Sequence, residues 1–118
     1  MNTISDTSDA GLQRLAEQLG ARLKDQHLTL CTAESCTGGL VTAALTEVPG
    51  SSAVLDRGFV TYSNQAKHQM LGVSNDIIDA FGAVSIACAW AMAKGAVDRS
   101  KADVAVAISG VAGPGGGT

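Results

Sequence analysis

The sequence predicts a three-layer α/β domain, in which helices cover both faces of a β-sheet. Helical and strand-like segments alternate along the chain, the order typical of this class. Hydrophobic residues make up 46% of the sequence and aromatic residues only 3%, a composition that suits close packing of helices on a sheet. The 118 residues suffice for one domain, which we place at 8–118 after a disordered tail at 1–7.

The first half of the chain predicts helix, strand, helix and strand. Leucines recur at helical spacing between residues 9 and 26, which predicts an amphipathic helix with one buried stripe. The short apolar segment 28–32 predicts a buried strand, and 40–45 predicts a second helix. Proline and glycine at 49–52 end that helix in a loop, after which 57–63 predicts another strand.

The second half predicts three helices and a final strand. A short helix that Asn64 can cap is closed by Gly72, and a second short helix follows at 76–82. An alanine-rich helix is predicted at 86–97, with a serine cap directly before it. The segment 103–109 is apolar on both faces, which predicts a strand that helices cover on each side.

Composition and charge exclude several classes of protein. The net charge of −3 and the scattered basic residues argue against a nucleic-acid-binding surface. The polar N-terminus is neither a signal peptide nor a membrane span. The three cysteines and two histidines have no zinc-type spacing, so we predict no metal. An odd cysteine count without a disulfide pattern predicts a reducing, cytoplasmic location.

One polar loop between a predicted strand and helix is CTAESCTGGL. Ser35 or Cys36 would project there as a nucleophile, at the end of a strand where α/β proteins bind ligands. Gly38 and Gly39 lack a Cβ, and the free N–H groups of the helix would attract a phosphate or an oxyanion. The alternative is structural: Ser35 and Thr37 cap the helix, and Cys36 is a small buried residue.

Two further side chains are candidates for proton transfer. Lys67 could activate a serine if burial removed its proton, and Tyr62 could bind a ligand or relay a proton. The simpler interpretation is a solvated surface lysine and a packed tyrosine ring. The glycine-rich segment 109–118 matches neither the P-loop nor the dinucleotide-binding pattern, which favours a flexible loop.

Three longer motifs together resemble one family: TAESCTGG, GSSAVLDRGFVTYSNQAK and AISGVAGPGGG. They are similar to the CinA C-terminal domain family, the nicotinamide-nucleotide amidases. The resemblance implies an α/β/α sandwich with a mixed, mostly parallel sheet, found in a cytoplasmic homodimer. It implies hydrolysis of nicotinamide mononucleotide (NMN) to nicotinic acid mononucleotide and ammonia, in pyridine-nucleotide recycling. No cofactor, metal, nucleic acid or membrane is implied; the partner is the small pyridine mononucleotide.

Carried over by position, the resemblance implies that Ser35 is the nucleophile and Lys67 its base. Ser52 would help to form the oxyanion hole and Tyr62 would line the site, although either Ser35 or Ser52 could attack. The substrate-binding residues that it implies are Glu34, Thr37, Gly38, Gly39, Ser109, Gly110 and Gly113.

Two other readings compete with the Ser35 amidase. The first is an amidase with Cys36 as its nucleophile, because a thiolate at a helix N-terminus would be well activated. The second is a non-catalytic nucleotide-binding or interaction module. The start of the sequence suggests the stand-alone form of the family. The family continues past AGPGGG with further strands, a closing helix and a substrate-binding arginine, so we expect a chain truncated at its C-terminus.

Overall fold

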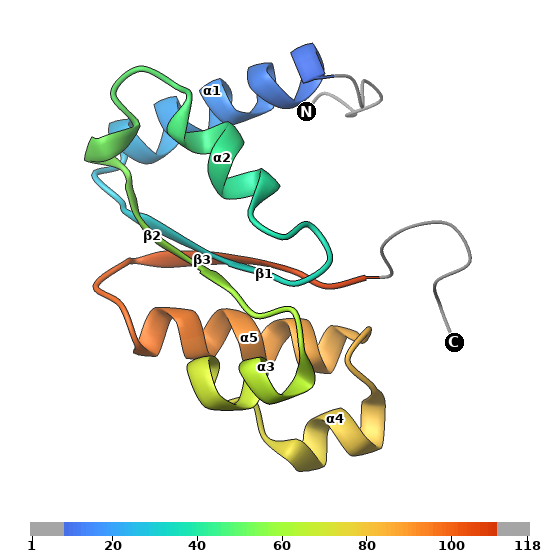
Figure 1. The fold of residues 1–118 in the computed structure, drawn as a ribbon. Coiled ribbons are helices and arrows are strands. Elements are labelled where there is room, and N and C mark those ends of the chain that lie inside the picture. The colour runs from blue at the N-terminus through green and yellow to red at the C-terminus, as the bar shows by residue number, and fades with distance from the viewer. Residues whose placement is uncertain (1–8, 111–118) are drawn as a thin grey trace.

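The computed structural model describes residues 9–110, which form three layers with a parallel sheet in the middle. In Figure 1, α1 and α2 lie on one side of the sheet, and α3, α4 and α5 lie on the other. The elements are α1 (Asp9–Asp25), β1 (Leu30–Glu34), α2 (Leu40–Thr46), the 3₁₀ turn η1 (Ser51–Ala53), β2 (Leu55–Val60), α3 (Asn64–Leu71), α4 (Asn75–Phe81), α5 (Ile86–Asp98) and β3 (Val104–Ile108). The predicted order of elements is therefore confirmed.

The described strands have the order β2-β1-β3 and are all parallel, so an antiparallel member of the predicted mixed sheet is not among residues 9–110. The central strand is β1, and every one of its residues is buried. It starts at Leu30, two residues later than predicted, because the backbone at His27 and Leu28 still bonds to the end of α1. The final strand was predicted to be covered on both faces, but Val106 is exposed, while Ala105 and Ala107 pack against the cluster that includes Met92 of α5. Among the described strands, β3 lies at the edge of the sheet.

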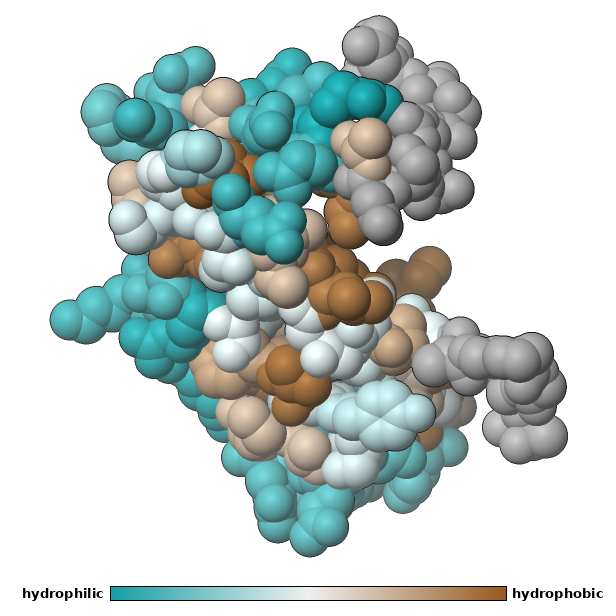
Figure 2. Space-filling view, turned by 45° about the horizontal axis from the view of Figure 1, so that its top comes forward, coloured by the Kyte–Doolittle hydropathy of each residue, from teal (hydrophilic) through white to brown (hydrophobic). Residues whose placement is uncertain are grey.

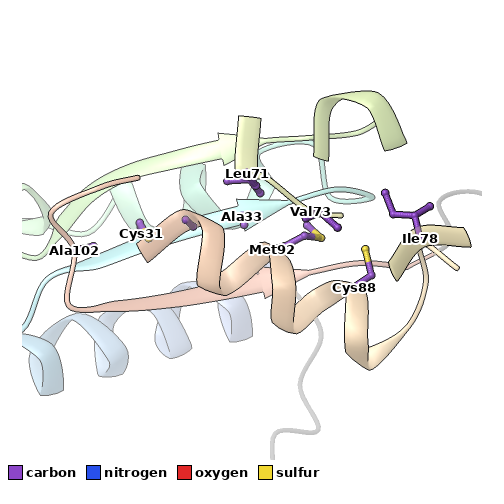
Figure 3. Close-up of a cluster of buried hydrophobic side chains, with 9 residues drawn as sticks. Cys31, Ala33, Leu71, Val73, Ile78, Cys88, Met92 and Ala102 are labelled. Carbon is purple, nitrogen blue, oxygen red and sulfur yellow. The ribbon is translucent and has the colours of Figure 1, made fainter. Parts of the chain in front are cut away.

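Side chains alternate across β1 and divide the core into two clusters. Cys31 and Ala33 pack among residues that include Leu71 and Met92 from α3 and α5 (Figure 3). Leu30 packs in the other cluster, with residues of α1 and α2. The same alternation directs Glu34 toward α2 and Ser35 toward α3 and α5, so adjacent residues serve opposite faces of the sheet.

The contact between α3 and α5 is unusually close. A Cβ on Gly95 would lie 1.9 Å from the carbonyl oxygen of Leu71, so only glycine fits where α5 crosses α3. Much of the surrounding cluster consists of alanine, cysteine and valine, as the low aromatic content predicts. This packing sets the position of α3 over the sheet.

The helix caps mostly follow the sequence. Ser85 accepts a hydrogen bond from the N–H of Cys88 at the start of α5, as predicted. At α3, however, the cap is Ser63 instead of Asn64, because β2 ends at Val60 and leaves Ser63 in an extended conformation. Gly72 closes α3 with a φ of 68°, as expected for a left-handed C-cap.

Two further features are the character of the helices and the distribution of hydrophobic residues on the surface. No helix within residues 9–110 has the length and apolar character needed to cross a membrane. Figure 2 shows hydrophobic residues gathered across the middle of one face, between more hydrophilic upper and lower ends.

Candidate active site

Ser35 and Lys67 meet at the carboxyl end of β1. Ser35 follows the strand directly, and its N–H still bonds to the carbonyl of Ile108 on β3. Lys67 lies on α3, 32 residues away in sequence, and its Nζ is 3.0 Å from the Oγ of Ser35. The two residues are only 6% and 1% exposed. The structure thus brings together a buried hydroxyl and a buried amine.

The surroundings of Lys67 favour its neutral form. Burial lowers the pKa of the Lys67 amine below its ordinary value, while the thiols of Cys88 and Cys36 oppose this effect in part. The amine also donates a hydrogen bond to the carbonyl oxygen of Tyr62, at 3.0 Å. Lys67 forms no ion pair with a carboxylate among residues 9–110. A neutral amine with a fixed orientation can accept a proton.

A cavity of about 210 Å³ opens beside this pair. It is lined by Ser35, Cys36, Tyr62, Asn64, Lys67, Ala83, Val84, Ser109 and Gly110. Of the residues implied by the family resemblance, the cavity includes both members of the Ser35–Lys67 pair, together with Tyr62, Ser109 and Gly110. Cys36, the rival nucleophile, also lies on its wall.

Three lining residues were not predicted as site residues from the sequence, although Asn64 was predicted as a helix cap. Asn64 lies three residues before Lys67 on the same helix, a spacing that puts both side chains on one helix face and could have identified it. Ala83 and Val84 belong to the connection between α4 and α5, and no chemical signal marks them. Ser109 donates a hydrogen bond to the carbonyl oxygen of Ala83, at 2.6 Å, which holds this connection against the end of β3.

Ser52 does not lie in this cavity. It belongs to η1, which precedes β2, and the first residue of β2 pairs with Leu30 at the start of β1. Ser35 follows the other end of β1, so five strand residues, or roughly 16 Å, separate the two serines along the sheet. This placement corrects the expectation that Ser52 and Ser35 share one site within the chain.

Glu34 also lies outside the cavity. Its side chain is completely buried on the α2 side, where Oε1 accepts hydrogen bonds from the hydroxyl of Thr37 and the N–H groups of Gly39 and Val41. Oε2 accepts two more from the N–H and the hydroxyl of Thr42. The first N–H groups of α2 are therefore occupied by Glu34, which corrects the expectation that they are free for a phosphate or an oxyanion.

The remaining predicted residues shape the loop. Gly38 and Gly39 have φ values of 61° and 109°, so both occupy conformations that favour glycine. Thr37 is bonded to Glu34 and is not part of the cavity wall.

Gly113 lies outside the described residues. No group of three potential metal ligands occurs in the part of the chain that the structure describes.

Comparison with known proteins shows which proteins this chain resembles in sequence and fold. The family model described as the CinA C-terminal domain matches residues 12–118. The nicotinamide-nucleotide amidohydrolase PncC of Escherichia coli is 51% identical over 94% of this chain and 67% of its own length. A CinA-like protein of Akkermansia muciniphila is 53% identical over 88% of this chain, but the match spans only 25% of that protein. The crystal structure of the competence/damage inducible protein CihA from Agrobacterium tumefaciens has a TM-score of 0.87 and 51% identity, over 100% of this chain and 69% of that chain.

Proposed function

The chain belongs to the CinA C-terminal domain family, and from this premise we propose that it hydrolyses the carboxamide of NMN, giving nicotinic acid mononucleotide and ammonia. The observation that carries the proposal is the 3.0 Å contact between Lys67 Nζ and Ser35 Oγ at a cavity wall. The name of the E. coli relative supports the choice of substrate. The chain spans about two thirds of that relative.

The proposed reaction proceeds through an acyl-enzyme. Neutral Lys67 takes the hydroxyl proton while the Oγ of Ser35 attacks the carboxamide carbon. The tetrahedral intermediate collapses, its C–N bond breaks, and Lys67 returns the proton to the leaving nitrogen, which departs as ammonia. Water then attacks the ester, and Lys67 passes the water proton back to Ser35. The net change is amide plus water to acid plus ammonia.

Backbone donors next to Ser35 are suited to hold the oxyanion. Ser35 cannot use its own N–H, which is bonded to Ile108. Across residues 9–110, the N–H groups of Cys36 and Thr37 have no hydrogen-bond acceptor. The N–H that follows a nucleophilic serine is a common oxyanion donor, and we assign this role to Cys36. The α2 N-terminus does not take this role, because Glu34 occupies it.

Substrate contacts are proposed around the same cavity. The Tyr62 side chain is 67% exposed at the rim, so its ring is free to pack against a nicotinamide. Asn64 and Ser109 offer polar atoms on the cavity wall. We propose that the glycine-rich segment 109–118 supplies donors for the substrate phosphate; most of this segment lies outside the described residues. A cytoplasmic location and the single domain at 8–118 stay predictions.

The direct test is ammonia release from NMN by this chain and by two single variants. Ser35→Ala is expected to lower kcat by at least about 10³-fold, because a covalent step is lost. Cys36→Ala keeps the backbone N–H and is expected to retain kcat within about threefold.

Other outcomes would reassign the site. Loss of activity in Cys36→Ala with retention in Ser35→Ala would identify the thiol as nucleophile. Titration calorimetry with NMN then separates two causes of a silent wild-type chain. Binding without ammonia release would support the nucleotide-binding module, and absence of both would contradict the proposed function.

A further inference from the structure

Glu34 carries a buried charge that the proposed chemistry does not use. Its side chain is 0% exposed, and all of its partners are neutral groups of residues 37–42. Burial alone would raise the pKa of Glu34, but hydrogen bonds from Thr37, Thr42 and Val41 outweigh it and lower the pKa below its ordinary value. Glu34 is therefore a carboxylate at neutral pH, held by five hydrogen bonds.

We infer that Glu34 is a positioning residue that fixes the loop carrying Ser35. Glu34 directly precedes Ser35, and its carboxylate accepts hydrogen bonds from Thr37 and Gly39 within the loop 35–39. It also accepts hydrogen bonds from the first turn of α2 after the loop, so one carboxylate connects both ends of the loop. On the N-terminal side Ser35 is held by its backbone bond to Ile108. On the C-terminal side, the hydroxyl of Thr37 lies 2.6 Å from Oε1 of Glu34. The catalytic part of this inference rests on the proposed function.

The loop needs such an anchor because of its glycines. Gly38 and Gly39 both have positive φ, and glycine populates many other conformations at little cost. Without the carboxylate, the segment would lose the bonds that select this conformation. A misplacement of a reacting group by about 1 Å can lower a rate by about 100-fold. The distance from Ser35 to Lys67 therefore depends on a side chain on the opposite face of the sheet.

The polar network around Glu34 also supplies a control. Oγ1 of Thr42 bonds to Glu34 and, at 2.6 Å, to Oγ1 of Thr32. A Cβ on Gly58 would lie within 2.7 Å of both hydroxyl oxygens, so a glycine on β2 leaves room for them. Thr32→Val removes a buried hydrogen bond of this network but leaves every bond to the Ser35 loop in place.

The first experiment compares Glu34→Gln, Thr37→Val, Thr37→Ser and Thr32→Val. In Glu34→Gln an amide NH₂ replaces an acceptor oxygen and faces N–H donors. Thr37→Val removes the hydroxyl without changing the shape of the side chain. Both are expected to lower kcat for NMN by about 10- to 100-fold, with KM within about threefold. Thr37→Ser restores the hydroxyl and should recover kcat, and Thr32→Val should keep it within about twofold.

Two further measurements do not depend on NMN. The rate at which a fluorophosphonate probe labels Ser35 should fall in Glu34→Gln and Thr37→Val, the variants in which kcat falls. It should stay unchanged in Thr37→Ser and Thr32→Val. Amide hydrogen exchange at Gly39 and Val41, or at Thr42, should become at least about 10-fold faster in Glu34→Gln, because an NH₂ group replaces one of the two oxygens that accept from these N–H groups. If wild type labels but releases no ammonia from NMN, the proposed substrate fails while these measurements still test the positioning role.

The inference would be overturned by either of two results. One is unchanged labelling in both Glu34→Gln and Thr37→Val together with unchanged exchange in Glu34→Gln. The other is an equal loss of labelling in Thr32→Val, which would show that the network only stabilises the fold. If Glu34→Gln does not fold, the comparison of Thr37→Val with Thr37→Ser decides alone.

Discussion

At the scale of single residues, the reactivity of Lys67 comes from where α3 places it. A lysine in a short helix is ordinarily solvated and protonated. Here the side chain is 1% exposed and its amine contacts a hydroxyl and a backbone carbonyl. Burial without a carboxylate partner among residues 9–110 disfavours the charged form, and this turns a common surface residue into a candidate base.

The lowered pKa of Lys67 predicts the pH dependence of the reaction. Activity requires the neutral amine, so kcat/KM should rise with pH and reach its plateau below the range in which an ordinary lysine titrates, about 10.4. Lys67→Arg should lower kcat at least about 10²-fold across the range, because a guanidinium keeps its proton. Steady-state ammonia release at a series of pH values measures both. A rising limb centred near 10.4 would contradict the role of Lys67 as base.

The same pKa shift predicts a pH-dependent stability. Because the pKa of Lys67 is lower in the folded chain, the unfolded chain binds more protons between the folded pKa and the ordinary value. The free energy of unfolding should therefore rise with pH through that window, by at most about 1.4 kcal/mol per pH unit. Below the folded pKa, the penalty for burying the ammonium is fully present.

Urea unfolding of wild type and Lys67→Met between pH 6 and pH 10 isolates this contribution. Titrating groups that do not interact with Lys67 are common to both chains and cancel in the difference, whereas the thiol of Cys88, which interacts with Lys67, contributes to it. The stability of wild type relative to Lys67→Met should increase with pH. A difference that does not change with pH would show that Lys67 titrates alike in the folded and unfolded chains.

At the scale of elements, the crossing of α3 and α5 sets the site. Gly95 lets the two helices approach closely, and α3 in turn carries Lys67 toward the end of β1. On the other face, the N-cap of α2 is Gly39, which has a left-handed conformation. Its N–H group donates a hydrogen bond to Glu34. The close contact at Gly95 therefore positions α3, and the buried charge of Glu34 positions the start of α2.

This close approach predicts a large effect of one methyl group. Gly95→Ala would bring a Cβ against the Leu71 backbone and should lower the free energy of unfolding by roughly 1–3 kcal/mol. Because the displaced helix carries Lys67, kcat should fall as well. Gly20→Ala is the matched control, since nothing lies within 4 Å of its added Cβ on α1. There we expect stabilisation of about 0.5–1 kcal/mol. Denaturant unfolding and ammonia release measure both, and equal effects at the two glycines would contradict the packing argument.

At the scale of the whole molecule, apolar side chains lie exposed in the α4–α5 connection and on α5. Val84, Ile86 and Trp90 are 57%, 90% and 65% exposed, and Val84 belongs to the cavity wall. Exposed apolar patches of this kind often mark interfaces. We therefore predict that the homodimer implied by the family resemblance has its interface at the α4–α5 connection.

The dimer prediction is tested by sedimentation equilibrium. Wild type should sediment as a dimer, and the double substitution Ile86→Lys with Trp90→Lys should raise the dissociation constant at least about 10²-fold, because two charges would enter an apolar contact. Leu12→Lys, at an exposed apolar position on α1, should leave it unchanged. A monomeric wild type would refute the dimer, and a dimer insensitive to the double substitution would place its interface elsewhere.

Local patterns alone determined the order of helices and strands, the small-residue core and the family. These features depend on periodicity, caps and motifs, which are properties of neighbouring residues. The boundaries of β1 were missed by two residues, and this shift moved Glu34 from a loop into a strand. The motif CTAESCTGG therefore indicated the right segment but not which of its side chains reach the cavity.

Only the tertiary structure decided how the candidate residues are grouped. The pairing of Ser35 with Lys67 joins positions 32 residues apart, whereas Ser52, which is nearer to Ser35 in sequence, lies at the other end of the sheet. Strand alternation then separated Glu34 from Ser35, since adjacent residues of a strand point to opposite faces. Local sequence therefore specified the elements and the chemistry available, while parallel strand pairing and helix packing selected which groups meet and which charge is buried.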